Sequence, residues 1–150
     1  MNRIWARRAG TLVAGALVVL TLQTPHAIAL PYDNTDPIST GCSASATTPR
    51  TAYITYGGFN IGQVLLRYST SCRTTWAKVN SFVTPCAADG NGCFYAQIYR
   101  NSDGYLLSRT SPTGTSTVYS NQLNDAGVTS FASSCMYYAS GYRCANTTSY

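Results

Sequence analysis

The carboxyl groups that could carry acid–base chemistry are few. From position 30 onward the chain has no glutamate and five aspartates: Asp33, Asp36, Asp89, Asp103 and Asp125. A glycosidase needs two carboxyl groups that face each other across a cleft. Several of these aspartates stand next to proline or glycine, where aspartate commonly bonds the local backbone of a turn. We therefore expect turn-forming aspartates, and a small hydrolase, or an inhibitor of one, is kept as an alternative.

Groups that activate a nucleophile are missing from the same part of the chain. The single histidine, His26, lies in the N-terminal stretch that we predict to be cleaved. Without histidine, Ser-His-Asp and Cys-His arrangements cannot form. Cysteines that are paired with one another supply no thiol nucleophile. The sequence thus predicts a protein that is not an enzyme, with no catalytic residue and no cofactor.

The cysteines follow the predicted cleavage point, at Cys42, Cys72, Cys86, Cys93, Cys135 and Cys144. An even number in an exported chain indicates three disulfides, because the compartment is oxidising. Other pairings are formally possible, but the turn-rich segments inside the second and third pairs favour sequential pairing, which leaves the first two cysteines for each other. No C-x-x-C spacing and no histidine accompany them, so we expect no metal site.

Tyrosine is unusually frequent, with twelve copies in the chain. It offers large amphipathic contact area at low entropic cost, which suits binding surfaces. Tyr137, Tyr138 and Tyr142 all lie between the last two cysteines and form one candidate binding segment. A second candidate segment lies near the predicted cleavage point and comprises Tyr32, Asp33, Asn34 and Asp36. For most other tyrosines we expect a role at the edge of a thin β core.

The elements that would position these residues are β-strands. Apolar and polar residues alternate over 51–56, 63–69, 75–83 and 94–100, the period of a half-buried strand. The sequence NSDG at 101–104 separates two such runs and is a strong hairpin signal, because its glycine can adopt a positive φ. These patterns predict an all-β fold, a small disulfide-stapled antiparallel sandwich or barrel.

The domain boundaries follow from where the alternation stops. Residues 30–41 contain two prolines and show no alternation, which predicts an extended N-terminal arm. We expect a single β domain at 42–150, with a polar tail from residue 145 onward.

The first 29 residues have the organisation of a cleavable signal peptide. Three arginines lie in MNRIWARR, residues 9–22 carry no charge, and Ala27-Ile28-Ala29 has the small-x-small pattern of a cleavage site. The uncharged run is too short to cross about 30 Å of hydrocarbon as a stable membrane anchor. We therefore predict a secreted, extracellular protein.

Removal of this segment lowers the positive charge. The formal charge of the whole chain is +5, whereas six arginines and one lysine against five aspartates give the remainder +2. No run of basic residues is left. We therefore expect no nucleic-acid partner.

Four strings together resemble a family of small exported bacterial proteins, the YjfA-like family, which is frequent in actinobacteria. They are TDPISTGC (35–42), VLLRYSTSCRTTWAKV (64–79), YAQIYRNSDG (95–104) and NQLNDAGVTSFAS (121–133). The resemblance implies a β fold and a Cys42–Cys72 bridge, while the other two cysteine pairs depart from the family pattern. No catalytic motif comes with it.

Domains of this kind look similar to the adaptor subunits of secreted umbrella-shaped toxin particles, which join a large toxin chain to a lectin-like subunit. The resemblance implies other secreted proteins as partners, with residues 30–40 as the docking element, because an extended segment can fill a cleft or add to a sheet edge. We thus expect a non-enzymatic binding module that serves as such an adaptor. The alternative is a cell-wall polysaccharide binder that uses Trp76 and the tyrosines at 137–142.

Overall fold

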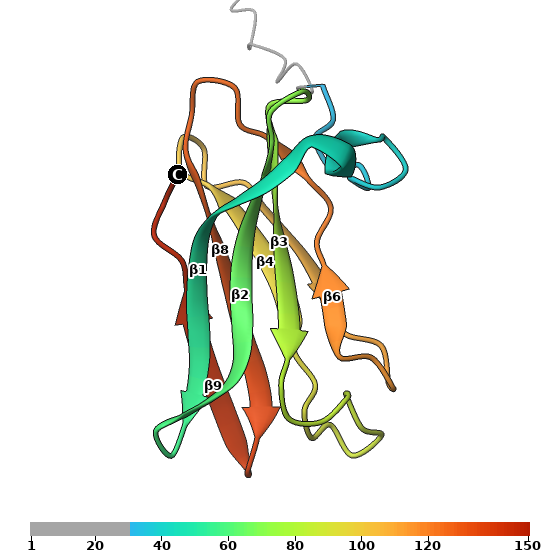
Figure 1. Cartoon of the computed structure of the whole chain (residues 1–150), viewed down its shortest axis with the longest axis vertical. Helices are drawn as coiled ribbons and strands as arrows, with labels where there is room; N and C mark the ends of the chain where they lie inside the picture. Colours follow the sequence, from blue (N-terminus) through green and yellow to red (C-terminus); the bar gives the residue numbers. More distant parts are fainter. Residues whose placement is uncertain (1–30) are drawn as a thin grey trace, which may run out of the picture.

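The structure, a computed structural model, describes residues 31–150, in which two antiparallel β-sheets pack face to face (Figure 1). This part of the chain forms a short 3-10 helix and then strands: η1 (Cys42–Ser45), β1 (Ala46–Tyr56), β2 (Phe59–Ser69), β3 (Thr74–Ser81), β4 (Tyr95–Arg100), β5 (Leu106–Thr110), β6 (Thr117–Tyr119), β7 (Leu123–Asn124), β8 (Ser130–Tyr138) and β9 (Gly141–Asn146). The predicted signal peptide lies outside the described residues. None of the described residues belongs to a helix with the length and hydropathy of a membrane span.

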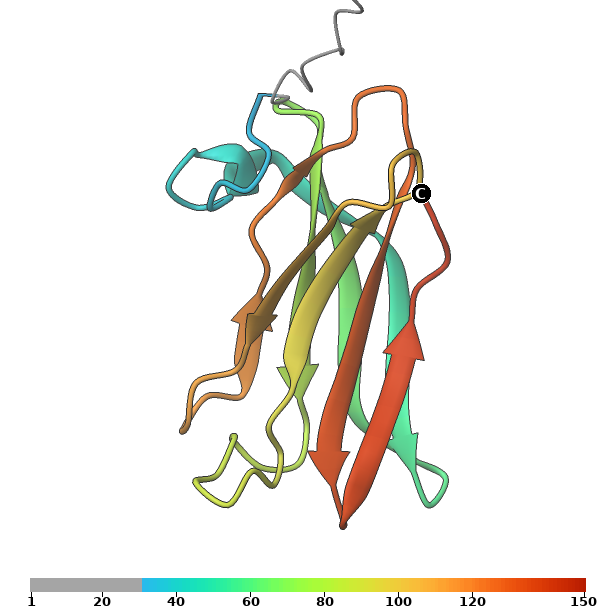
Figure 2. The same cartoon turned by 180° about the vertical axis from the view of Figure 1, so that it is seen from behind.

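The strands form the predicted antiparallel sandwich. One sheet has the order β1-β2-β3-β6, with the short β7 also paired to β3, and the other has the order β5-β4-β8-β9. Figure 2 shows the second sheet from its outer side. The β4–β5 and β2–β3 connections lie at one end of the sandwich, and the β1–β2 and β8–β9 hairpins lie at the opposite end (Figure 1).

Side-chain alternation builds the core between the sheets. The inward positions of β2, β3 and β4 are fully buried, as predicted: Val64, Leu66, Ala77, Val79, Ala96 and Ile98. The segment 101–104 connects β4 to β5 as an antiparallel hairpin, and Gly104 has a φ of 68°. Both findings confirm the sequence-based interpretation of this region.

Three disulfides join the cysteines in sequential pairs, which confirms the favoured pairing. Cys42–Cys72 joins η1 to the turn between β2 and β3. Cys86–Cys93 closes a loop that precedes β4. Cys135–Cys144 connects β8 to β9, whose backbones are paired at these two residues.

The N-terminal segment 31–41 is folded against the sandwich, which corrects the predicted extended arm. Residues 31–34 and 37–40 form turns. Asp36 Oδ1 accepts a hydrogen bond from the Ile38 backbone N–H at 2.7 Å, and the Asn34 N–H donates to the Gln122 carbonyl at 2.9 Å. Pro37 is fully buried. These local turn bonds and long-range contacts make the segment compact.

The predicted polar tail is also part of the fold. Residues 145 and 146 belong to β9, and the chain beyond them continues along β8. The Thr147 N–H donates to the Ala132 carbonyl at 2.9 Å, and the Tyr150 N–H donates to the Ser130 carbonyl at 3.0 Å.

Candidate functional site

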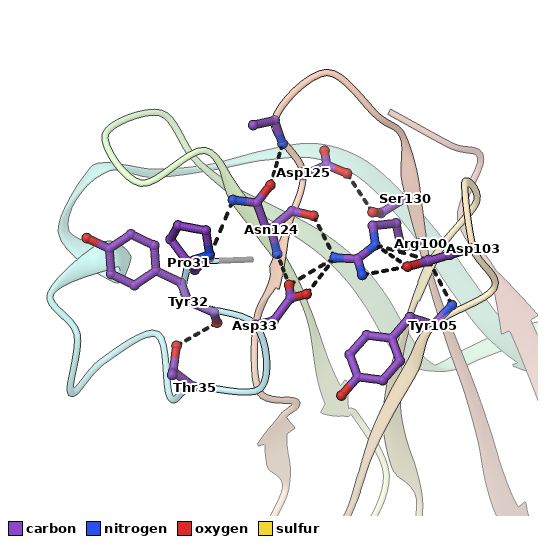
Figure 3. A network of polar contacts seen from close by, with 11 residues as sticks. Pro31, Tyr32, Asp33, Thr35, Arg100, Asp103, Tyr105, Asn124, Asp125 and Ser130 are labelled. Atoms are coloured by element: carbon purple, nitrogen blue, oxygen red, sulfur yellow. Dashed lines mark hydrogen bonds and ion pairs between the residues drawn. The ribbon is translucent and has the colours of Figure 1, made fainter. Parts of the chain in front are cut away.

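Arg100 fastens the N-terminal segment to the second sheet (Figure 3). Its Nη1 donates to both carboxylate oxygens of Asp33, each at 2.9 Å. Its Nε and Nη2 donate to Asp103, with a shortest distance of 2.7 Å. Nη1 also lies 3.3 Å from the Asn124 carbonyl oxygen, and the Tyr105 ring centre is 5.4 Å from the guanidinium carbon. One arginine therefore joins the N-terminal turn, the β4–β5 hairpin and β7.

The place of Arg100 follows from the alternation of β4. Ala96 and Ile98 face the core, and Arg100 continues their face at the end of the strand, where it is 5% exposed. A buried cation needs a compensating charge. The hydrogen bonds that Arg100 donates to Asp103 and Asp33 hold the pKa of Arg100 above its ordinary value despite its burial. The two aspartates are thus structural partners of one arginine.

Gln122 provides the second attachment of the N-terminal segment. This residue is fully buried, and its Nε2 donates to Thr35 Oγ1 and Thr40 Oγ1, both at 2.9 Å. Its Oε1 accepts a hydrogen bond from Thr74 Oγ1 at 2.7 Å. Because the amide is hydrogen-bonded at both its oxygen and its nitrogen, it fixes the distance between the N-terminal turns and β3.

The structure places the four predicted N-terminal binding residues in this folded segment. The side chains of Asp33, Asn34 and Asp36 form hydrogen bonds within the domain itself. Asn34 Oδ1 accepts from Asn121 Nδ2 at 2.9 Å, and Asp33 Oδ1 also accepts from the Asn124 backbone N–H at 2.6 Å. Tyr32 and Asn34 are both exposed, but the Asn34 side chain is hydrogen-bonded to Asn121, whereas the Tyr32 side chain has no hydrogen-bond partner among the described residues. Of the four, the tyrosine is therefore the side chain best placed to meet a partner.

The carboxyl groups that come together here are poorly suited to general acid catalysis. Asp33 and Asp103 flank Arg100, and hydrogen bonds from the guanidinium lower the pKa of Asp103 to about 2. A group held in its charged form does not donate a proton near neutral pH. Burial raises the pKa of Asp125 to about 6, the direction that general acid catalysis requires. However, Asp125 is only 6% exposed and its Oδ1 accepts a hydrogen bond from Ser130 Oγ at 2.6 Å, so its carboxyl is not open to a substrate. This arrangement does not favour the hydrolase alternative.

A groove of about 810 Å³ lies at the opposite end of the sandwich. The loop closed by Cys86–Cys93 forms one wall, and β4, β5, β8 and β9 supply the rest. Its lining is mainly aromatic and cysteine side chains with few polar groups: Asp89, Gly90, Cys93, Phe94, Tyr95, Thr110, Cys135, Tyr137 and Tyr142. Two disulfides contribute to the walls, so the groove is framed by cross-linked backbone. Such a site is preorganised and loses little entropy on binding.

The predicted tyrosine segment divides between two environments. Tyr137 and Tyr142 pack edge to face in the groove, with ring centres 5.4 Å apart. Tyr138 instead packs against the core and against Tyr56, at 5.5 Å. Neighbouring residues of a strand point to opposite faces, which separates the adjacent tyrosines. Trp76, also considered as a binding aromatic, is only 4% exposed and is not available to a ligand.

Tyr95 of β4 completes the aromatic wall, and the sequence did not single it out. Burial raises its pKa, with smaller contributions from Tyr99 and Tyr142. Its backbone lies beside Cys135 in the ladder between β4 and β8, so two segments about 40 residues apart meet here. The alternation of β4 could have placed residues 95, 97 and 99 together on the outer face of the sheet. The sequence did not indicate which strand would lie next to β4.

Among residues 31–150, no three His, Cys, Asp or Glu side chains are grouped so as to hold a metal ion. Two candidate sites thus remain, a polar network around Arg100 at one end of the sandwich and an aromatic groove at the other. The polar groups of the network are hydrogen-bonded to one another, whereas the groove offers open surface to a ligand.

No curated protein and no solved structure matches the chain. The model of a family described as a protein of unknown function (DUF2690) matches residues 30–147, a range that includes both the N-terminal segment and almost all of the sandwich, and the chain therefore belongs to that family.

Proposed function

We propose that the protein is a secreted, non-enzymatic binding module that holds polysaccharide, such as that of a cell wall, in the aromatic groove. The observation that carries the proposal is the pairing of Tyr137 with Tyr142 beside Tyr95 in an open groove of about 810 Å³. Ligand sites of this kind combine apolar walls with a few orienting polar groups. Asp89 and Thr110 supply such groups here.

The chemistry of a sugar fits this lining. A sugar ring has apolar C–H faces, which pack on aromatic rings, and a rim of hydroxyls, which hydrogen-bond to carboxylate and hydroxyl groups. Tyr142 is 69% exposed, so its ring offers a large free surface while its partner Tyr137 fixes its orientation. A side chain that is exposed yet held in place loses little entropy when it binds.

A second candidate is docking to another secreted protein, as an adaptor between a large toxin chain and a lectin-like subunit. The folded N-terminal segment favours it, because Tyr32 and Ile38 are exposed there although neighbouring residues are firmly bonded to the domain. Exposed apolar side chains on a rigid loop are typical of protein-docking sites. For this candidate function the docking element is the folded loop of residues 31–41 and not an extended strand.

A retention experiment tests the leading proposal. The purified, disulfide-bonded protein is incubated with insoluble peptidoglycan, chitin and cellulose, and bound and free fractions are measured. We expect saturable retention on at least one of them. Tyr142→Ala should weaken it at least tenfold, about 1.4 kcal/mol, since tyrosines are frequent energetic centres of binding sites.

The matched control is Tyr53→Ala. Tyr53 is exposed as well, but it lies on β1 in the other sheet. Its loss should leave retention unchanged. Equal retention of both variants, or no retention of the unmodified protein, contradicts polysaccharide binding in the groove. Recovery of larger secreted proteins with a tagged copy from the native culture fluid, abolished by changes at Tyr32 and Ile38, would favour the adaptor.

A further inference from the structure

The outer face of the β5-β4-β8-β9 sheet extends beyond the groove toward the other end of the sandwich. The ladders place Tyr95 opposite Thr110, Gln97 opposite Ser108 and Ser133, and Tyr99 opposite Phe131. On the neighbouring strand β9, Tyr142 and Asn146 are exposed on the same side. The groove therefore lies at one end of a longer row of outward-facing side chains. Figure 2 shows the strands that carry them.

Aromatic side chains lie at both ends of this surface. Tyr137 and Tyr142 form the pair in the groove, and Tyr99 and Phe131 stack in parallel at the other end, with ring centres 4.8 Å apart. Tyr137 and Phe131 are six residues apart on β8, which corresponds to roughly 20 Å along a strand. A ligand that touched both pairs would be an extended chain and not a single small molecule.

The middle of the surface carries uncharged polar groups. Ser108, Gln97, Ser133 and Asn146 lie across it in one row. The Tyr99 hydroxyl donates to Gln97 Oε1 at 3.2 Å, which orients the amide and leaves its N–H groups for a ligand. Amide and hydroxyl side chains of this kind match the hydroxyls and acetamido groups of sugars.

The charge of the surface restricts the ligand further. The arginines of these strands serve other faces: Arg109 lies over the Tyr119 ring at 5.4 Å, and Arg143 lies over the Tyr56 ring at 4.9 Å. Arg100 is buried in the polar network. Among the described residues of the outer face and groove, Asp89 is the charged one. An anionic polymer would find no cation here, so an uncharged ligand fits best.

We propose that the outer face binds a linear, uncharged glycan chain that runs along β4 and β8 from the Tyr137/Tyr142 pair to the Tyr99/Phe131 pair. This inference rests on the proposed function of the groove and extends it to the form and charge of the ligand. The groove holds one end of the chain, the polar row contacts its middle, and the Tyr99/Phe131 stack holds the other end.

Calorimetric titration with oligomers of increasing length tests this proposal. The purified, disulfide-bonded protein is titrated with N-acetylglucosamine and glucose oligomers, from disaccharide to hexasaccharide. We expect the affinity for one series to rise at least tenfold from disaccharide to hexasaccharide. Phe131→Ala and Gln97→Ala should each remove most of that gain and leave disaccharide binding unchanged. The control Phe59→Ala, at an exposed residue of the β1–β2 hairpin, should change neither affinity.

The outcomes separate this inference from the function of the groove. Equal affinity for short and long oligomers, still sensitive to Tyr142→Ala, would confine the site to the groove and overturn the extended surface alone. Tighter binding of an anionic oligogalacturonate than of either hexasaccharide would overturn the uncharged ligand. Absence of binding to both series would overturn the extended surface and the proposed function together.

Discussion

Replacement of Arg100 by alanine should detach the N-terminal segment and destabilise the domain. The side chain of Arg100 is 6% exposed and that of its partner Asp33 is 13% exposed, so the substitution leaves a largely buried carboxylate without its cation. Removal of one member of a buried ion pair typically costs 3–5 kcal/mol, and an exposed partner adds little. Asp103 is the exposed partner. We therefore expect a loss of about 3 kcal/mol, at the low end of that range.

Thermal and urea unfolding measure this loss. For a domain of this size, about 3 kcal/mol corresponds to a decrease in Tm of roughly 10 °C. Amide hydrogen exchange should show faster exchange at Asn34 and Asn124, whose N–H groups are bonded across the segment. Asp33→Asn keeps an oxygen acceptor and should lose less, about 1–2 kcal/mol. It provides a second test if the alanine variant fails to fold.

Arg109→Ala is the matched control, because Arg109 is exposed and lies over a tyrosine ring without an ion pair among the described residues. Its loss should change the free energy of unfolding by no more than about 0.5 kcal/mol. If Arg100→Ala and Arg109→Ala proved equally mild, below about 1 kcal/mol, the assignment of Arg100 as the anchor of the segment would be refuted.

Three further predictions concern stability. Burial raises the pKa of Asp125 from 3.8 to about 6 in the folded protein, so the contribution of Asp125 to the free energy of unfolding is complete below about pH 4 and is lost as the pH rises through 6. Asp125→Asn should therefore flatten the decrease in Tm between about pH 4 and pH 7, and an unchanged dependence of Tm on pH would contradict this. Gly62→Ala places a Cβ 2.9 Å from a backbone oxygen of β3 and should cost about 1–3 kcal/mol in urea unfolding. Gly141→Ala meets the end of a flexible arginine side chain and should be milder; the reverse order would count against the packing described. Double replacement of Cys42 and Cys72 by serine opens the longest disulfide loop and should cost up to about 4 kcal/mol of stability in thermal unfolding without reductant. Removal of the shorter β8–β9 bridge should cost about 3 kcal/mol. Equal losses would argue against an entropic origin of the stabilisation by the disulfides.

Local patterns were sufficient to predict much of the fold. Alternation identified the buried faces of β2, β3 and β4, because their inward positions carry uninterrupted apolar residues such as Val64, Leu66 and Ile98. It failed for β8, where the inward Ser130 and Ser134 are buried between apolar positions. A small hydroxyl can occupy a thin core, and it then interrupts the apolar pattern.

The N-terminal segment shows what local patterns do not contain. Its compact shape depends on Arg100 and Gln122, which lie far along the chain and bond to Asp33 and Thr35. Arg100 did carry a signal, since an arginine at a core-facing position of a strand requires a buried counter-charge. Its partner could not be chosen from sequence, because several aspartates were available.

The lining of the candidate groove could be predicted only where local sequence position determines it. Tyr137 and Tyr142 could be located from the tyrosine-rich segment between two cysteines, and both line the groove. Strand parity placed Tyr138 on the opposite face, where it packs on the core. The contribution of Tyr95 depends on the pairing of β4 with β8, a contact between distant segments.

The most direct test of the central claim is a map of ligand contacts by NMR. A ¹⁵N-labelled, disulfide-bonded sample would be titrated with the neutral oligosaccharide that binds most tightly in the calorimetric titration. We predict chemical-shift changes concentrated at Tyr95, Tyr137 and Tyr142, with little change at Asp33 and Arg100 at the opposite end. Changes centred on the N-terminal segment, or no saturable change at the groove, would contradict the account.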